Sequence, residues 1–422
     1  MQNMNDMKNG FLIFFVLSTY AGRSQEVLKL DSIFAAITLH YPALKGYDAE
    51  IRSLDEAAKG ARSWDAPLLS TGLWMTPYDP NLWKKQDNGT TGMGQYMISV
   101  QQMFPNKKRQ DADVQYMLGM SSVQKEKKND AINQLYATAK QNYYQWIILK
   151  KKLAVLYQDS VLLDFMIKNA ELRYKNNLGK ISVYYKLKAS LGNIENMRIV
   201  MENDIVQKRI VLNTLMNRDK NFLFDVDTLF NQTSYTELVP DSVSFSQTRS
   251  DIRAVENDIL LISLQQSSEM GKLKPEFGVR YDNMFGFGGL PMQYSLMGMV
   301  RLPMVTWSSR SAKANVESLR WKAESLQQQK QAMINEATGL SYGLQREIIS
   351  KQKQIRLFEK NILPALRRNF QTMQLGYEQN TEELFTLFDA WQSLDMTQLE
   401  YLDQLKELML MQVELERILE IK

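Results

Sequence analysis

The spacing of apolar residues predicts two long helical hairpins. In residues 307–422 apolar side chains recur at spacings of four and three, with one break at residues 377–381. This spacing is typical of a coiled-coil seam. The first arm, residues 311–374, would be on the order of 95 Å long at about 1.5 Å per residue, with at most a kink at Pro364. Helical spacing in residues 105–174 and 182–216 predicts the other hairpin.

Two pairs of strands are predicted where the apolar period changes to two. They cover residues 67–78 and 94–104, and then residues 275–285 and 292–303. Each strand has one apolar and one mostly polar face, as in a barrel that faces lipid outside and water inside. The lumen side would carry Arg280, Asp282 and Arg301.

Four strands are too few to close a barrel around water, and open strand edges cannot lie in lipid. The strand pattern therefore predicts that copies of the chain complete the barrel. The alternative is a pair of solvent-exposed hairpins packed on a helical bundle, which would leave the aromatic residues of the apolar face in water.

The order helix, two strands, helical hairpin occurs twice along the chain. We predict a first repeat at residues 25–220, a linker at 221–247 and a second repeat at 248–422. Residues 1–24 are interpreted as a signal peptide, because Lys8 precedes an apolar run at 11–17 and small residues follow up to Ser24. The fold class is mainly α with a membrane β-barrel portion.

Composition excludes several classes of function. The 51 basic and 47 acidic residues are mixed throughout, which argues against a nucleic-acid partner. The chain has no cysteine and one histidine, so thiol nucleophiles, Cys/His zinc sites and Ser/His/Asp triads are excluded. We predict no enzyme activity, no catalytic residues, no cofactor and no metal site. The methionines at 284, 292, 297, 299 and 304 leave a copper alternative open, since thioethers bind Cu(I), although methionine more often packs.

Short motifs then follow one another in a recognisable order. They are YPAL at 41–44, APL at 66–68, MFPNKKR at 103–109, RSDIRA at 249–254, LP at 302–303 with Arg310, and ILP at 362–364 followed by Tyr377. With these motifs the chain resembles the TolC-like outer-membrane efflux protein family over nearly its whole mature length. Residues 104–108 are similar to the heavy-metal or cation-efflux branch of that family.

The resemblance implies a homotrimer in the outer membrane of a Gram-negative bacterium. Each chain would give four strands to a shared twelve-stranded barrel, in contact with outer-membrane lipid, and two helical hairpins to a periplasmic tunnel. Such proteins are passive exit ducts, joined by a periplasmic adaptor protein to an inner-membrane efflux pump. The expected cargo is small toxic compounds or metal cations.

The resemblance also implies a periplasmic gate at the second hairpin tip. Tyr377 matches a gating tyrosine and Asp389 a pore aspartate, whereas Glu382 stands where an arginine and Thr386 where a second aspartate are found. Three copies of Asp389 would form an acidic ring that favours cations; the alternative is a carboxylate on a solvated helix face. Lys186 and Lys188 at the first tip suggest that opposite charges pair between the hairpins.

Two other functions remain open from the sequence. One is an outer-membrane duct of a protein secretion system, built on the same fold. The other is a coiled-coil scaffold without a pore, which would explain the heptads but not the leader or the alternating strands.

Overall fold

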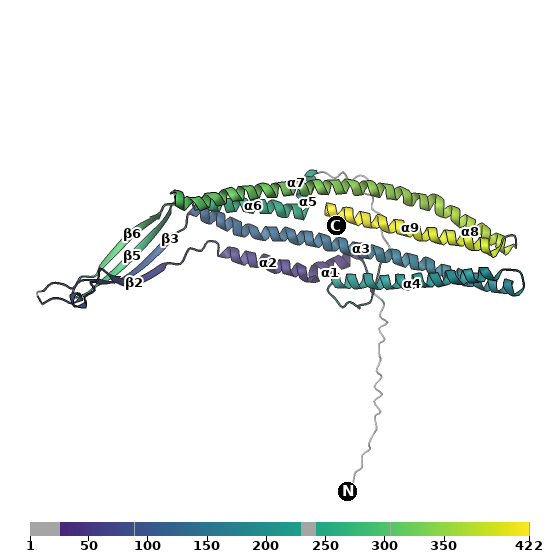
Figure 1. Cartoon of the computed structure of the whole chain (residues 1–422), viewed down its shortest axis with the longest axis horizontal. Helices are drawn as coiled ribbons and strands as arrows, with labels where there is room; N and C mark the ends of the chain where they lie inside the picture. The colour runs from purple at the N-terminus through teal and green to yellow at the C-terminus, as the bar shows by residue number, and fades with distance from the viewer. Residues whose placement is uncertain (1–25, 88, 229–241, 304, 422) are drawn as a thin grey trace, which may run out of the picture.

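The computed structural model describes residues 26–87, 89–228, 242–303 and 305–421. The molecule is elongated, with a small sheet at one end and helical hairpin tips at the other (Figure 1). The predicted signal peptide, residues 1–24, lies outside the described residues. No helix in the described ranges is long and apolar enough to span a membrane.

The first hairpin consists of α3 (Lys107–Lys175) and α4 (Ile181–Leu215). Asn106 starts α3, because its side chain accepts a hydrogen bond from the backbone N–H of Lys108. With 69 residues, α3 is roughly 100 Å long at about 1.5 Å per residue. The prediction of one uninterrupted helix after the second strand is confirmed.

The second hairpin contains α7 (Thr306–Leu357), a π-helical turn (Phe358–Ile362), α8 (Leu363–Glu378) and α9 (Leu384–Leu419). The kink expected at Pro364 appears as the π-helical turn just before it. Proline has no N–H to donate to the preceding turn, and the N–H of Leu363 bonds to the carbonyl of Phe358 instead.

Shorter elements lie along the middle of the molecule, beside the hairpins (Figure 1). These are α1 (Leu30–His40), α2 (Pro42–Lys59), α5 (Ser242–Thr248) and α6 (Ser250–Gly271). Here β1 (Glu26–Leu28) pairs in parallel with β4 (Phe224–Val226). The stretch interpreted as a linker, 221–247, therefore holds β4 and most of α5, and its residues 229–241 lie outside the described residues. The repeat boundaries themselves stay a prediction.

The sheet at the far end has the order β2-β3-β5-β6, and all its pairs are antiparallel. Its strands are β2 (Leu68–Trp74), β3 (Gln95–Phe104), β5 (Glu276–Gly286) and β6 (Gln293–Arg301). Because β3 pairs with β5, the sheet joins the two repeats. In the described chain β2 and β6 each have one free edge.

Both hairpin loops of the sheet meet at its outer end. The N–H of Gly92 donates to the carbonyl of Gly288 at 2.9 Å, and the rings of Trp83 and Phe287 stack 5.4 Å apart. Trp83 belongs to a 3-10 turn (Pro80–Trp83) in the loop between β2 and β3. The loop contacts hold the two strand pairs in register.

The sheet exposes its apolar face. Tyr281 and Leu296, which are cross-strand partners, have 45% and 68% of their surface exposed. By contrast Ser99 and Asp282, paired on the opposite face, are 1% and 2% exposed. The predicted alternation of faces is confirmed. Such an apolar surface is unusual in water unless something covers it.

The helical core is divided into clusters along the long axis. One lies near α1 around Trp146 and Phe224, and another near the hairpin tips around Phe388 and Trp391. The apolar face predicted for the last helix is confirmed, since its members are buried or partly buried: Leu384, Leu387, Trp391, Leu394, Leu399, Leu402, Leu405 and Met409.

Candidate functional site at the hairpin tips

The two hairpins end in turns of the same backbone geometry. Asn177 and Asn380 have φ values of 58° and 57°, in the left-handed region that asparagine tolerates better than most residues. At the first tip the N–H of Leu178 bonds to the carbonyl of Arg173 at 2.7 Å. At the second, the N–H of Thr381 bonds to the carbonyl of Gly376 at 2.8 Å. The matched turns bring both tips to the same end of the molecule (Figure 1).

Tyr377 lies between the two hairpins. Its ring packs against the apolar tip cluster, and the guanidinium of Arg173 on α3 lies 5.5 Å from the ring centroid. A cation over an aromatic face is attracted by the ring quadrupole. Tyr377, one of the four predicted gate residues, is thus in contact with the neighbouring hairpin.

Lys186 also crosses between the hairpins, but it does not meet an acid there. Its ammonium lies 4.4 Å from the ring centroid of Phe385 and 4.9 Å from that of Phe388, both on α9. Lys188 lies over Tyr184 within its own hairpin, 5.2 Å from the ring centroid. We expected opposite charges to pair between the hairpins; within one chain these lysines meet aromatic rings instead.

The other predicted gate residues do not form one cluster. Glu382 accepts a hydrogen bond from the hydroxyl of Thr386 at 3.2 Å, so these two are partners within one turn. Asp389 is exposed, on the side of α9 away from the buried Leu387 and Phe388. Within the part of the chain that the structure describes, Asp389 makes no hydrogen bond and no ion pair, so its role stays a prediction.

On the sheet, the predicted lumen residues lie in ion pairs on the polar face. Arg280 Nε is 2.8 Å from Asp282 Oδ1, and Arg301 Nη1 is 3.0 Å from Glu276 Oε2. Arg109, at the start of α3, also reaches Glu276 at 3.0 Å. Glu276 and Arg109 were not among the predicted lumen residues, although Glu276 alternates in phase with Arg280 and Asp282 in the sequence.

Comparisons with known proteins agree on the fold. No family model matches the chain, and no curated protein matches it either. Solved structures do match. VceC of Vibrio cholerae, an outer-membrane protein, has a TM-score of 0.72 at 14% identity, over 92% of this chain and 95% of its own. CusC, whose structures concern transmembrane channel formation, has a TM-score of 0.75 at 12% identity, over 92% and 91%. The Campylobacter jejuni outer-membrane channel CmeC has a TM-score of 0.70 at 11% identity, over 99% and 94%.

The chain has the fold of these outer-membrane channels. The predicted fold class is therefore confirmed: long hairpins, four strands and the short helices between them. In this channel fold the strand end and the hairpin tips are the two ends of one shaft (Figure 1). Between the two ends, side chains of α3 contact those of α9 and so join the first hairpin to the second.

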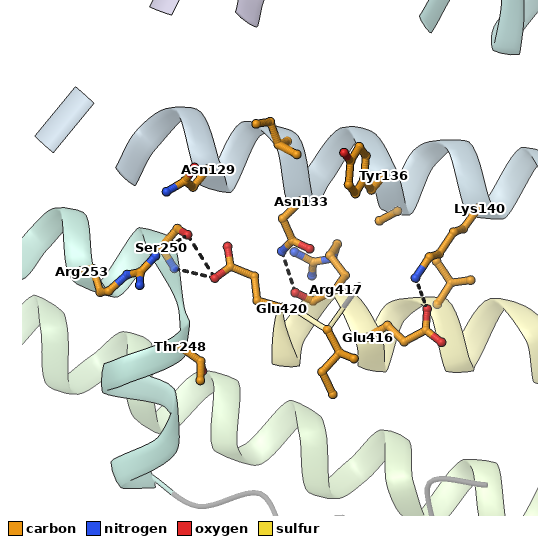
Figure 2. A pocket seen from close by; sticks show the side chains of 14 residues that line it. Asn129, Asn133, Tyr136, Lys140, Thr248, Ser250, Arg253, Glu416, Arg417 and Glu420 are labelled. Atoms are coloured by element: carbon orange, nitrogen blue, oxygen red, sulfur yellow. Dashed lines mark hydrogen bonds and ion pairs between the residues drawn. The ribbon is translucent and has the colours of Figure 1, made fainter. Parts of the chain in front are cut away.

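Halfway along the channel fold, the end of α9 lies against α3 and next to the start of α6 (Figure 2). The backbone N–H and hydroxyl of Ser250 donate to Glu420 Oε2 at 2.7 and 3.1 Å. Glu420 thus accepts from a backbone N–H in the first turn of α6 that has no partner within the helix. Burial raises the pKa of Glu420, against the opposing effect of these hydrogen bonds. Asn133 donates to the carbonyl of Arg417 at 2.8 Å. A cavity of about 270 Å³ remains between these groups.

A buried carboxyl pair was missed by the sequence analysis. Asp159 on α3 and Asp395 on α9 are 8% and 9% exposed, and the indole N–H of Trp391 donates to Asp159 at 2.6 Å. The spacing contains a signal for them: Asp159 follows Leu156 by three residues and Asp395 follows Trp391 by four, which are core positions of a helix.

Among the described residues, no three His, Cys, Asp or Glu side chains are grouped so that their oxygen, nitrogen or thiol ligands could hold a metal ion. Of the five methionines noted near the second strand pair, Met304 lies outside the described residues and Met292 precedes β6. Met284, Met297 and Met299 share the polar face, where Met297 pairs with Arg280 and Met299 with Gly278.

Proposed function

We propose that this chain is the outer-membrane channel of a tripartite efflux system. It acts as a passive exit duct in the outer membrane of a Gram-negative bacterium and extends into the periplasm. A periplasmic adaptor protein joins it to an inner-membrane pump. Small toxic compounds or metal cations are the cargo.

The observation that carries this proposal is the four-stranded sheet with an exposed apolar face and two free edges. An apolar face of this kind fits contact with hydrocarbon, and a sheet in lipid must close on itself because unpaired N–H and C=O groups are costly there. Three copies bring twelve strands, an even number within the range of bacterial barrels. The polar face, with Arg280, Asp282 and Arg301, then lines the lumen.

The long hairpins fit a duct better than a scaffold. They extend away from the sheet as a shaft whose seam on α7 is only partly covered in one chain: Val316, Leu319, Ala323 and Leu326 are half-buried. Neighbouring copies would cover the rest of that seam. A scaffold without a pore has no use for a sheet that is apolar on one face and charged on the other.

Reconstitution into planar lipid bilayers tests this function. The purified trimer is expected to produce discrete conductance steps whose size reflects a wet pore. Protein that inserts but never conducts at any applied voltage would count against the duct.

Asp389 gives a prediction on selectivity. If three copies surround the axis at the tip, their negative potential favours cations and repels anions. Asp389→Asn is then expected to move the K⁺/Cl⁻ permeability ratio towards one, measured by the reversal potential in a salt gradient. Glu56→Gln is the matched control, because Glu56 is an exposed carboxylate paired with Lys59 on α2. An unchanged ratio in Asp389→Asn would leave Asp389 as a solvated surface charge.

A further inference from the structure

A line of polar contacts joins the two hairpins along the α3–α9 interface. Near the middle of the molecule Lys140 Nζ lies 2.5 Å from Glu416 Oε2, and further along Lys152 Nζ lies 2.7 Å from Asp403 Oδ2. The lysine side chains are only 8% and 11% exposed. Each of these contacts pairs a cation with an anion, because a buried charge is costly without a counter-charge.

The next contact towards the tips is different, because it joins two acids. Asp159 on α3 faces Asp395 on α9, both more than nine-tenths buried. Trp391 donates its N–H to Asp159 Oδ1, whereas Asp159 Oδ2 and Asp395 Oδ1 have no hydrogen-bond partner among the described residues. Asp159 and Asp395 interact directly through their side chains, and two buried carboxylates in contact cannot both ionise without strong repulsion. One proton on Asp395 lets it donate to Asp159 and removes that repulsion.

Among the described residues, no ion pair or hydrogen bond joins a cation to either carboxyl of the pair. The apolar tip cluster encloses it, with Leu156 and Leu163 on α3 and Ile194 on α4. The nearby charged and titratable groups are engaged elsewhere: Lys152 with Asp403, Lys186 over Phe385 and Phe388, Arg198 over Tyr157 and beside Glu202, and Tyr377 beneath Arg173.

We propose that Asp159 and Asp395 share one proton and act as a pH-sensitive catch between the two hairpins, which holds the tips together while the proton is bound. This inference rests on the proposed function only in assigning the catch to a channel gate. When the proton leaves, the two carboxylates repel one another and the outer part of α9 separates from α3. The ion pairs nearer the middle stay closed, so the movement is confined to the tip side.

The sign of the pH dependence follows from the direction of the shift. Burial, together with the neighbouring Asp159, raises the pKa of Asp395 to about 8. Burial also raises the pKa of Asp159. The protonated pair is therefore present below about pH 8, and the attraction is lost as the pH rises through that value.

Spin-label distances between the tips test the catch in the full-length trimer. The chain has no native cysteine, so nitroxides can be placed on Leu178→Cys and Gln379→Cys, one exposed site at each tip. Doubly labelled chains are diluted with unlabelled chains so that distances within one chain dominate. Between pH 5 and 9.5 the distance distribution is expected to shift to longer values, and to change no further above about pH 8.

Two variants make the result specific. Asp395→Asn keeps a donor to Asp159 but cannot ionise, so it should hold the short distance at every pH. Asp164 is an exposed acid on α3, on a different face of the helix from the buried Asp159. Asp164→Asn should therefore retain the wild-type shift. The catch is overturned if the wild-type distance does not change with pH, or if Asp395→Asn shows the same shift as the wild type.

Conductance recordings separate this inference from the proposed function. A pore whose open probability rises with pH in the wild type but not in Asp395→Asn supports both. If the protein conducts and the tip distance ignores pH, the catch alone is overturned. If it never conducts, the duct fails, and the spin-label distances still decide whether the catch exists.

Discussion

Lysine substitutions on the apolar face of the sheet are expected to abolish assembly in the membrane. Tyr281 and Leu296 face each other across β5 and β6 with much of their surface exposed. A lysine at the midplane of a bilayer, on the lipid side of a barrel, costs about 2–4 kcal/mol. Tyr281→Lys and Leu296→Lys should therefore remove most of the protease-resistant trimer from the outer-membrane fraction.

The neighbouring residue provides the control. Ser295 precedes Leu296 on the same strand, lies on the opposite face and pairs with Asp282. Ser295→Lys introduces the same charge at almost the same depth, but into the wet lumen beside a carboxylate, and should assemble normally. If Ser295→Lys fails and Leu296→Lys assembles, the faces have been assigned the wrong way round.

Removing the acid from the buried ion pair Lys140–Glu416 should be the most damaging change in the helical shaft. Lys140 comes from α3 and Glu416 from α9, and their side chains are 8% and 15% exposed. Glu416→Ala leaves the ammonium of Lys140 buried without its counter-charge, which costs about 3–5 kcal/mol. Chemical unfolding of the trimer, followed by circular dichroism of the helices, would show the loss as a lower denaturant midpoint.

Two further variants test whether the unpaired charge of Lys140 causes the loss of stability in Glu416→Ala. Glu56→Ala breaks a pair whose side chains are both 69% exposed, and pairs of this kind contribute roughly 0–1 kcal/mol. Adding Lys140→Met to Glu416→Ala removes the buried charge and should recover much of the midpoint. If Glu416→Ala is no worse than Glu56→Ala, the pair at the end of α9 does not stabilise the shaft.

The fold could largely be predicted from the sequence because its elements are long and strictly periodic. Sixty or more residues of helical spacing identify α3 without knowledge of its partners. The alternation from Phe277 to Phe285 fixes which face of β5 is apolar, and the structure agrees. A periodic pattern is read over many residues, so a single residue that departs from it does not change the predicted element.

Contacts between distant residues could not be predicted in the same way. β1 and β4 are three residues each and pair across about 200 positions; neither is long enough to show a period. Lys186 was expected to meet an acid, but the residues opposite it on α9 are phenylalanines, and only the alignment of the two hairpins shows this. Asp159 and Asp395 were not selected for the same reason: their contact joins α3 to α9 across the two hairpins.

The candidate gate was only partly predictable. Tyr377 was selected through the family resemblance, and the structure places it against the other hairpin. Asp389 lies on an exposed helix face, and its surroundings in a trimer depend on neighbouring chains. The residues that physically join the tips, Arg173 and Lys186, are long cations whose aromatic partners come from the other hairpin.

The most direct test of the account is where the protein is found and in how many copies. Cells expressing the full chain are fractionated into outer membrane, inner membrane and soluble proteins, and each fraction is treated with a chemical cross-linker. The account predicts a cross-linked trimer in the outer-membrane fraction. A soluble protein, or an uncross-linked monomer in any fraction, would contradict the channel and favour a coiled-coil scaffold.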